Sequence, residues 1–128
     1  MQRFARRDYS RHTDADLALA FRALAHPLRI SALRAFAIAE RPLGSVDVAW
    51  METEDIPATT IRHHLERLAE AGILRPLGPR PEGGVGRPAQ RYVLTDLGLA
   101  MLPLLRHAAA AASPRRHATR AAAAASSV

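Results

Sequence analysis

The chain has 128 residues, which is enough for one domain with a modest core and short flanking segments. It contains no cysteine, and this excludes a disulfide framework, a thiolate metal site and a cysteine nucleophile. The formal net charge of +6 favours an anionic partner.

The positive charge is concentrated at the two ends of the sequence. Residues 1–13 carry four arginines and one acid, a net charge of +3, and residues 106–128 carry four arginines and no acid. The segment between them holds ten arginines against eleven acids and is nearly neutral. All eighteen basic residues are arginine, which fits a biased genomic base composition; arginine is also the side chain that binds phosphate and guanine through two hydrogen bonds.

This distribution predicts three segments. We expect a basic N-terminal arm over residues 1–13, a folded domain over 14–107 and a disordered tail rich in Ala, Arg and Ser over 108–128. The longest apolar run, residues 97–105, is interrupted by Pro103 and is far shorter than the roughly 20 residues of a membrane-spanning helix. The basic N-terminal residues precede no apolar segment, so we expect no signal peptide and a cytoplasmic protein.

The first half of the domain reads as three helices. A first helix, capped by Asp14 or Asp16, extends to Ala25, and the His26-Pro27 step marks a break because a residue before proline disfavours helical geometry. Pro27 then begins a second helix that ends near residue 39. After a turn at residues 41–44, a short third helix covers residues 45–51, and we expect Trp50 and Met51 in the core.

The second half reads as a helix, a hairpin and a last helix. The fourth helix begins at Pro57 or Ala58, after an acidic turn at residues 52–55, and Gly72 ends it. Strands follow at residues 73–77 and 90–94, joined by a loop rich in glycine and proline. Thr95 or Asp96 caps the last helix, which we expect Pro103 to weaken.

The fourth helix has two contrasting faces. At 100° per residue Ile61, Leu65 and Leu68 form an apolar stripe, and polar side chains occupy the rest of the surface. A helix in the DNA major groove presents its N-terminal turns to the base edges. We therefore expect base contacts and phosphate contacts from two groups of residues, namely Thr59, Arg62 and His63 for the bases and Thr60 and Arg67 for the phosphates. The alternative is an ordinary solvated helix face.

The hairpin loop carries arginines at positions suited to a nucleic acid. Arg80, Arg87 and Arg91 lie in or beside residues 77–90. Pro88 holds Arg87 in extended geometry, which suits a reach into the narrow minor groove of A·T-rich DNA. The alternative, a hairpin with no partner, explains less well why the hairpin follows the polar helix directly.

Three segments resemble the winged helix-turn-helix regulators of the ArsR-like type, and they occur in the order typical of that family. They are ALAHPLRISALRAF (23–36), TTIRHHLERLAEAGIL (59–74) and GRPAQRYVLTDLG (86–98). The resemblance implies an α+β, mainly α fold, with four to five helices and a two-stranded hairpin called the wing. It also implies a homodimer on a palindromic operator, with DNA contacts at Ala58, Thr59, Arg62, His63 and Arg87.

The sequence also departs from that family. The turn before the fourth helix is longer than usual and carries Glu52, Glu54 and Asp55, which would either cap the helix or repel a phosphate backbone. Metal sensors of the family use cysteine pairs or clustered His and Asp on the last helix. That helix offers only Asp96 and, at its end, His107. We therefore predict no metal site and no cofactor.

Apolar residues on the first and last helices exceed what a small domain needs to cover. They predict a dimer surface, unless the last helix packs within its own chain as a lid on the core; the residues concerned are Leu17, Phe21, Leu99, Leu102 and Leu105. We find no catalytic motif around Ser10, Ser31, Ser45 or Ser113, and we predict that the protein is not an enzyme.

The predicted function is sequence-specific binding of double-stranded DNA by a dimeric repressor. Helix 58–71 would lie in the major groove and the wing, residues 77–90, in the minor groove. The alternative is a winged-helix protein-interaction module with weak or no specific DNA binding, which the acidic turn and the nearly neutral central segment favour. A sensor gated by a small-molecule effector requires a pocket that the sequence does not reveal.

Overall fold

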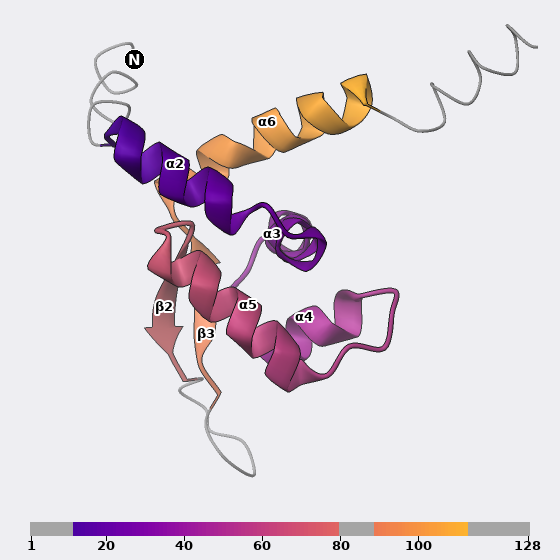
Figure 1. The fold of residues 1–128 in the computed structure, drawn as a ribbon. Coiled ribbons are helices and arrows are strands. Elements are labelled where there is room, and N and C mark those ends of the chain that lie inside the picture. Colours follow the sequence, from indigo (N-terminus) through magenta and orange to yellow (C-terminus); the bar gives the residue numbers. More distant parts are fainter. Residues whose placement is uncertain (1–11, 80–88, 113–128) are drawn as a thin grey trace, which may run out of the picture.

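A computed structural model describes residues 12–79 and 89–112. This part of the chain forms five helices and a three-stranded antiparallel sheet (Figure 1). In chain order the elements are α2 (Asp14–Ala23), α3 (Pro27–Ala39), β1 (Leu43–Gly44), α4 (Ser45–Met51), α5 (Ala58–Glu70), β2 (Leu74–Gly78), β3 (Arg91–Leu94) and α6 (Asp96–Ala111). The expected α+β, mainly helical fold is confirmed.

Local sequence signals begin the first two helices. The hydroxyl of Thr13 accepts a hydrogen bond from the amide of Asp16, and the Asp16 carboxylate accepts one from the amide of Thr13. This capping box corrects the expectation that Asp14 or Asp16 is the cap. His26 caps α3 through Nδ1, which accepts from the amide of Leu28, and Pro27 follows as the first helical residue.

The sheet contains a strand that the sequence did not predict. Residues 43–44, expected to lie in a turn, form β1 and pair with β3, so that the strand order is β1-β3-β2. Leu43 lies opposite Tyr92, and Leu74 of β2 lies opposite Leu94. A two-residue strand has no periodicity of its own, and its strand geometry comes from the pairing with β3.

The core lies between the helices and one face of the sheet. Its largest fully buried side chains lie on α3, β1, α4 and α5 and at the start of β2, and they are Leu33, Leu43, Val48, Ile61, Leu65, Leu68, Ile73 and Leu74. Three of these form the predicted apolar stripe of α5, and each is fully buried. Burying such a side chain contributes about 1.5–3 kcal/mol, so this stripe fixes the orientation of α5 on the domain.

The C-terminal helix is joined closely to the end of α5. The hydroxyl of Thr95 caps α6 by accepting from the amide of Gly98, and it donates to the carbonyl groups of Gly72 and Ile73. Gly72 has a φ of +81°, which glycine adopts at little cost. The helix continues unbroken through Pro103 to Ala111, past the expected boundary at residue 107. Pro103 is exposed, so water can satisfy the carbonyl group that proline leaves without a donor.

Helix α5 packs on α4 and precedes the β2–β3 hairpin, which projects from the end of the molecule opposite α2 and α6 (Figure 1). Two packed helices followed by a β-hairpin define the winged helix-turn-helix fold, with α4 and α5 as the helix-turn-helix pair. None of the helices in the described ranges has the length and apolar character to cross a bilayer.

Candidate nucleic-acid interface

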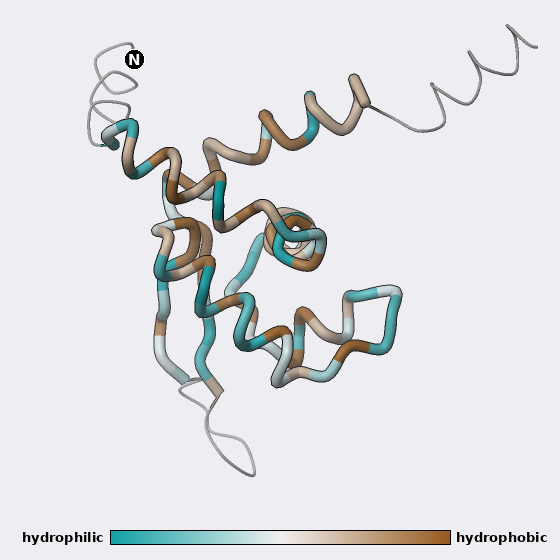
Figure 2. Tube along the Cα trace, viewed as in Figure 1, coloured by the Kyte–Doolittle hydropathy of each residue, from teal (hydrophilic) through white to brown (hydrophobic). Residues whose placement is uncertain are grey.

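Helix α5 exposes the polar face that its sequence predicts. The side chains of Thr59, Thr60, Arg62, His63 and Arg67 are exposed, whereas Ala58 is half-buried. Figure 2 shows the same contrast, with hydrophilic and hydrophobic residues alternating along α5. The structure therefore brings together on one helix the predicted base-contact and phosphate-contact residues of this segment.

Two glutamates neutralise part of this face. Arg62 Nε lies 4.0 Å from a carboxylate oxygen of Glu66, and Arg67 Nη1 donates to Glu70 at 2.8 Å. All four side chains are more than half exposed, so each pair is worth at most about 1 kcal/mol. A phosphate or a guanine edge can therefore compete with the glutamates for either arginine.

The N-terminus of α5 has no side-chain cap. Pro57 occupies the cap position, and its carbonyl accepts from the amides of Thr60 and Ile61. The acidic turn at residues 52–55 does not cap this helix. Glu52 instead accepts a hydrogen bond from the hydroxyl of Ser31, at 2.8 and 3.0 Å to its two carboxylate oxygens, and so joins the turn to α3.

A histidine and an arginine connect the back of α5 to α3. The Nε–H of Arg29 donates to Nδ1 of His64 at 3.1 Å, and Nη1 of Arg29 donates to the carbonyl of Ala23 at 3.2 Å. The rings of His26 and His64 lie 4.4 Å apart. Burial lowers the pKa of His64, and the neighbouring His26, Arg29 and His63 lower it further. A neutral His64 is required here, because Nδ1 must be unprotonated to accept from Arg29.

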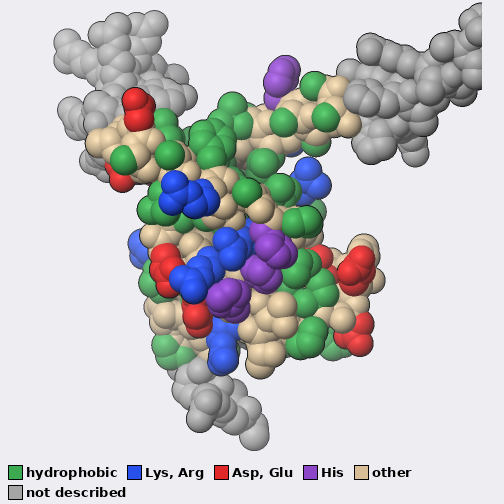
Figure 3. Space-filling view, in the orientation of Figure 1, with side chains coloured by type: hydrophobic (Ala, Val, Ile, Leu, Met, Phe, Trp, Pro, Cys, Tyr) green, Lys and Arg blue, Asp and Glu red, His purple; other side chains and the backbone are tan. Residues whose placement is uncertain are grey.

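The histidines and arginines gather on one face of the molecule. Figure 3 shows His side chains beside Arg side chains over the middle of the face on which α5 lies, with acidic side chains mainly at its edges. Three histidines lie close together: the ring centroid of His64 is 4.4 Å from that of His26 and 5.5 Å from that of His63. We call this group, with Arg29, the His/Arg cluster.

The wing is described only in its strands. Arg91 is half-buried, its Nη2 approaches the carbonyl of Pro79 at 3.4 Å, and its buried Nε has no hydrogen-bond partner in the described residues. Arg91 is thus partly withdrawn from the surface on which the sequence placed it. Arg80 and Arg87 lie outside the described residues.

Exposed apolar side chains lie mainly on α2, α4 and α6. Of the predicted dimer residues, Leu17, Phe21 and Leu99 are exposed, but Leu102 and Leu105 are half-buried and pack against the core. Trp50 is 85% exposed, which corrects its expected core position. The inward positions of α4 are taken by Val48 and, in part, Ala49, and Trp50 therefore points outward. Leu104 of α6 is exposed too, and sequence reasoning missed the exposed Ile38 of α3.

No three His, Asp or Glu side chains in residues 12–79 and 89–112 are grouped as a metal site requires. Among the histidines of the His/Arg cluster, His26 Nδ1 accepts a hydrogen bond from the amide of Leu28 and His64 Nδ1 accepts one from Arg29. The second of these hydrogen bonds stabilises the packing of α3 against α5.

The sequence and the fold were compared with those of known proteins. No protein-family model matches the sequence, and no curated protein sequence matches it. Among solved structures, the chain is similar to Rv0081 of M. tuberculosis, with 24% identity, coverage of 81% of this chain and 91% of that one, and a TM-score of 0.49. It is also similar to the transcriptional repressor BigR from Xylella fastidiosa, with 20% identity, coverage of 77% and 91%, and a TM-score of 0.48. The assignment to the winged-helix class stands on the topology of this chain.

Proposed function

We propose that this protein is a DNA-binding transcriptional regulator of the ArsR-like type, acting as a dimeric repressor on a palindromic operator. The observation that carries the proposal is the two-faced α5. Its apolar stripe is fully buried, and its opposite face presents Thr59, Arg62 and His63 on an uncapped N-terminal half. Amide groups at an uncapped helix N-terminus favour phosphate, and the exposed side chains favour base edges.

The roles of the residues follow from their chemistry. Arg62 would bind guanine through two hydrogen bonds, while Thr59 and His63 would contact neighbouring bases. Thr60 and Arg67 would bind phosphates, together with the backbone at Ala58. From the wing, Arg87 would enter the minor groove, and Arg80 and Arg91 would add phosphate contacts.

A dimer would place two copies of α5 in successive major grooves, about 34 Å apart. Its surface would use the exposed apolar residues Leu17 and Phe21 of α2 together with Leu99 and Leu104 of α6. Both helices lie at the end of the molecule opposite the wing, where a partner would not obstruct α5 (Figure 1).

Sedimentation of a Phe21→Glu variant tests the dimer surface. We expect this variant to be monomeric at concentrations where the unmodified protein is dimeric, because a charge would be buried in the interface. Leu19→Glu is the matched control, since Leu19 is similarly exposed but lies on another side of the same helix. If both variants form dimers as readily as the unmodified protein does, α2 is not part of the interface.

Selection from random duplexes, with the purified protein at two salt concentrations, tests DNA reading. We expect enrichment of a palindrome whose half-sites are one helical turn apart, with weaker recovery at the higher salt concentration. Enrichment of no sequence, with weak and salt-sensitive retention of all duplexes, would contradict the proposal.

One observation favours a second function, that of a protein-interaction module. Trp50 is 85% exposed on α4, and Val46 and Met51 beside it are also exposed. Tryptophan is enriched at the centres of protein interfaces. The exposed acidic residues Glu54 and Asp55, which follow α4 in the chain, would weaken binding to a phosphate backbone there.

The Trp50→Ala variant separates these two functions. If the protein is a DNA reader, the enriched palindrome should be unchanged, because α4 is not the helix that carries the base-contact residues. If it is an interaction module, the duplex selection should fail for the unmodified protein, and any protein partner it binds should be lost on the Trp50→Ala change.

A further inference from the structure

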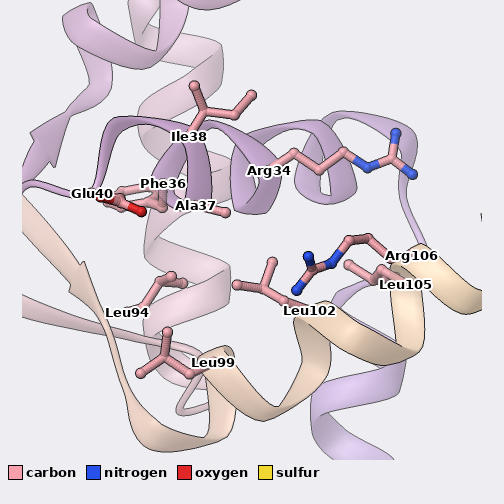
Figure 4. A pocket seen from close by; sticks show the side chains of 10 residues that line it. All are labelled: Arg34, Phe36, Ala37, Ile38, Glu40, Leu94, Leu99, Leu102, Leu105 and Arg106. Atoms are coloured by element: carbon pink, nitrogen blue, oxygen red, sulfur yellow. The ribbon is translucent and has the colours of Figure 1, made fainter.

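An apolar groove of about 710 Å³ lies between α3 and α6, away from the exposed face of α5 (Figure 4). Leu94, Leu102 and Leu105 form its floor, and each is half-buried against the core. Phe36 and Ala37 of α3 and Leu99 of α6 complete the apolar wall. Its volume falls within the range of small-molecule sites, about 300–1,000 Å³.

Two arginines lie at one end of the groove. Arg34 comes from α3 and Arg106 from α6, and Figure 4 shows the side chain of Arg106 turned back over the space between the two helices. Neither arginine has an acidic partner within 4.0 Å in the described part of the chain. The groove therefore combines an apolar body with two cationic groups at one end.

The lining contains one acidic side chain, Glu40, and its position gives the groove a positive and a negative end. Glu40 follows Arg34 by six residues, which separates the two by about 9 Å along α3. An anionic group is attracted to the arginine end and repelled from the Glu40 end. A ligand with a single anionic head and an apolar tail would thus have one preferred direction in the groove.

The same charges disfavour the other possible occupants. The terminal segments at residues 1–11 and 113–128 contain an excess of arginine and would meet Arg34 and Arg106 as like charges. A second copy of α6 seated in the groove would add its own Arg106 to a lining that already holds two arginines and one acid. Neutral apolar molecules would leave both arginines without a partner.

We propose that this groove binds small amphipathic carboxylates, with the carboxylate at the end that holds Arg34 and Arg106 and the apolar chain over Leu94 and Leu102. Arginine suits this role because its guanidinium group is always charged and matches a carboxylate through two parallel hydrogen bonds. The proposal concerns binding alone and is independent of whether α5 binds DNA.

Calorimetric titration of the full-length protein with octanoate, in the absence of DNA, tests the proposal. We expect saturable binding of one octanoate per chain, and weaker binding of 1-octanol, which has the same chain length but no charge. The Arg34→Ala and Arg106→Ala changes should each weaken octanoate binding about three- to tenfold while leaving 1-octanol unaffected. Both arginines are exposed, so neither change should disturb folding.

Two further variants complete the test. Arg75→Ala removes an exposed arginine on β2, outside the groove, and should leave octanoate binding unchanged. Ala37→Phe should fill the groove and weaken octanoate and 1-octanol alike. The proposal is overturned if octanoate and 1-octanol bind equally well, or if the Arg34 and Arg106 variants bind octanoate as the unmodified protein does. It is also overturned if octanoate binds only after dilution to monomer, which would identify a second copy as the occupant.

Discussion

Arg62 lies one helical turn before Glu66 on the exposed face of α5, and this position makes it the most informative single residue for DNA reading. We predict that Arg62→Ala costs about 1–3 kcal/mol of discrimination at one base pair of each half-site, because a bidentate contact to guanine is lost. Competition binding with operators that carry single substitutions measures this. Arg75→Ala is the control, and an unchanged preference at every base would remove Arg62 from the base-contact residues.

His64 is the residue whose titration should affect stability. Its folded-state pKa is lowered by burial and by His26, Arg29 and His63, so the unfolded chain binds the proton more readily. The unfolded state therefore gains protons first as the pH falls below about 6.5, and the stability conferred by a neutral His64 is lost progressively toward its lower folded-state pKa. Above about pH 6.5 this contribution should be constant.

Urea unfolding at several pH values between 7.5 and 5 measures this effect. The unmodified protein should become less stable as the pH falls through this window. His64→Gln retains an acceptor for Arg29 but cannot be protonated, and its stability should fall less. If the free energy of unfolding falls with pH equally in the two proteins, protonation of His64 is not the cause of the lost stability.

At the scale of elements, the N-terminus of α6 depends on a close approach to the start of β2. A Cβ atom at Gly98 would clash with the backbone carbonyl oxygen of Ile73 and press on the side chain of Leu94. We predict that Gly98→Ala destabilises the protein by about 1–3 kcal/mol, since backbone must move to make room. Chemical denaturation measures this, with Ala100→Ser, at an exposed position of the same helix, as a control expected to stay within about 0.5 kcal/mol.

The elements differ in how completely the sequence predicted them. Helices α3, α4 and α5 agree with the expected ranges because proline, glycine and a 3.6-residue apolar repeat are local signals. The strand β1 was not predicted, since two residues carry no repeat and depend on pairing with Tyr92 and Arg91, far along the chain. The exposure of Trp50 was also not predicted, because a seven-residue helix with apolar residues on several sides does not reveal which side is covered.

For the whole molecule, the charge distribution predicts two separable contributions to DNA binding. Residues 1–13 and 106–128 hold the excess of arginine, while residues 14–105 are nearly neutral and carry the proposed base contacts. We predict that the logarithm of the DNA-binding constant falls linearly with the logarithm of the salt concentration. The slope should be about −0.9 for each phosphate contacted, with ~6–10 phosphates contacted per dimer. Removing residues 113–128 should reduce the slope without changing the preferred sequence. A changed sequence preference would assign base contacts to that segment.

The sequence by itself determined the order of the helices, the two faces of α5 and the position of the hairpin. These features depend on residues within a few turns or strand lengths of one another, and side-chain periodicity records them directly. The exposed positions of the candidate DNA-contact residues of α5 could be predicted for the same reason. That these residues contact DNA stays a prediction.

Only the tertiary structure decided what lies behind and beside that face. The contact between Arg29 and His64 joins residues 35 positions apart, and the groove between α3 and α6 is lined by residues from both helices and from β3. The withdrawal of Arg91, the burial of Leu102 and Leu105 and the pairing of Glu52 with Ser31 belong to the same group. Such contacts depend on how separate elements pack, and no local repeat in the sequence specifies which of several exposed or apolar faces another element will cover.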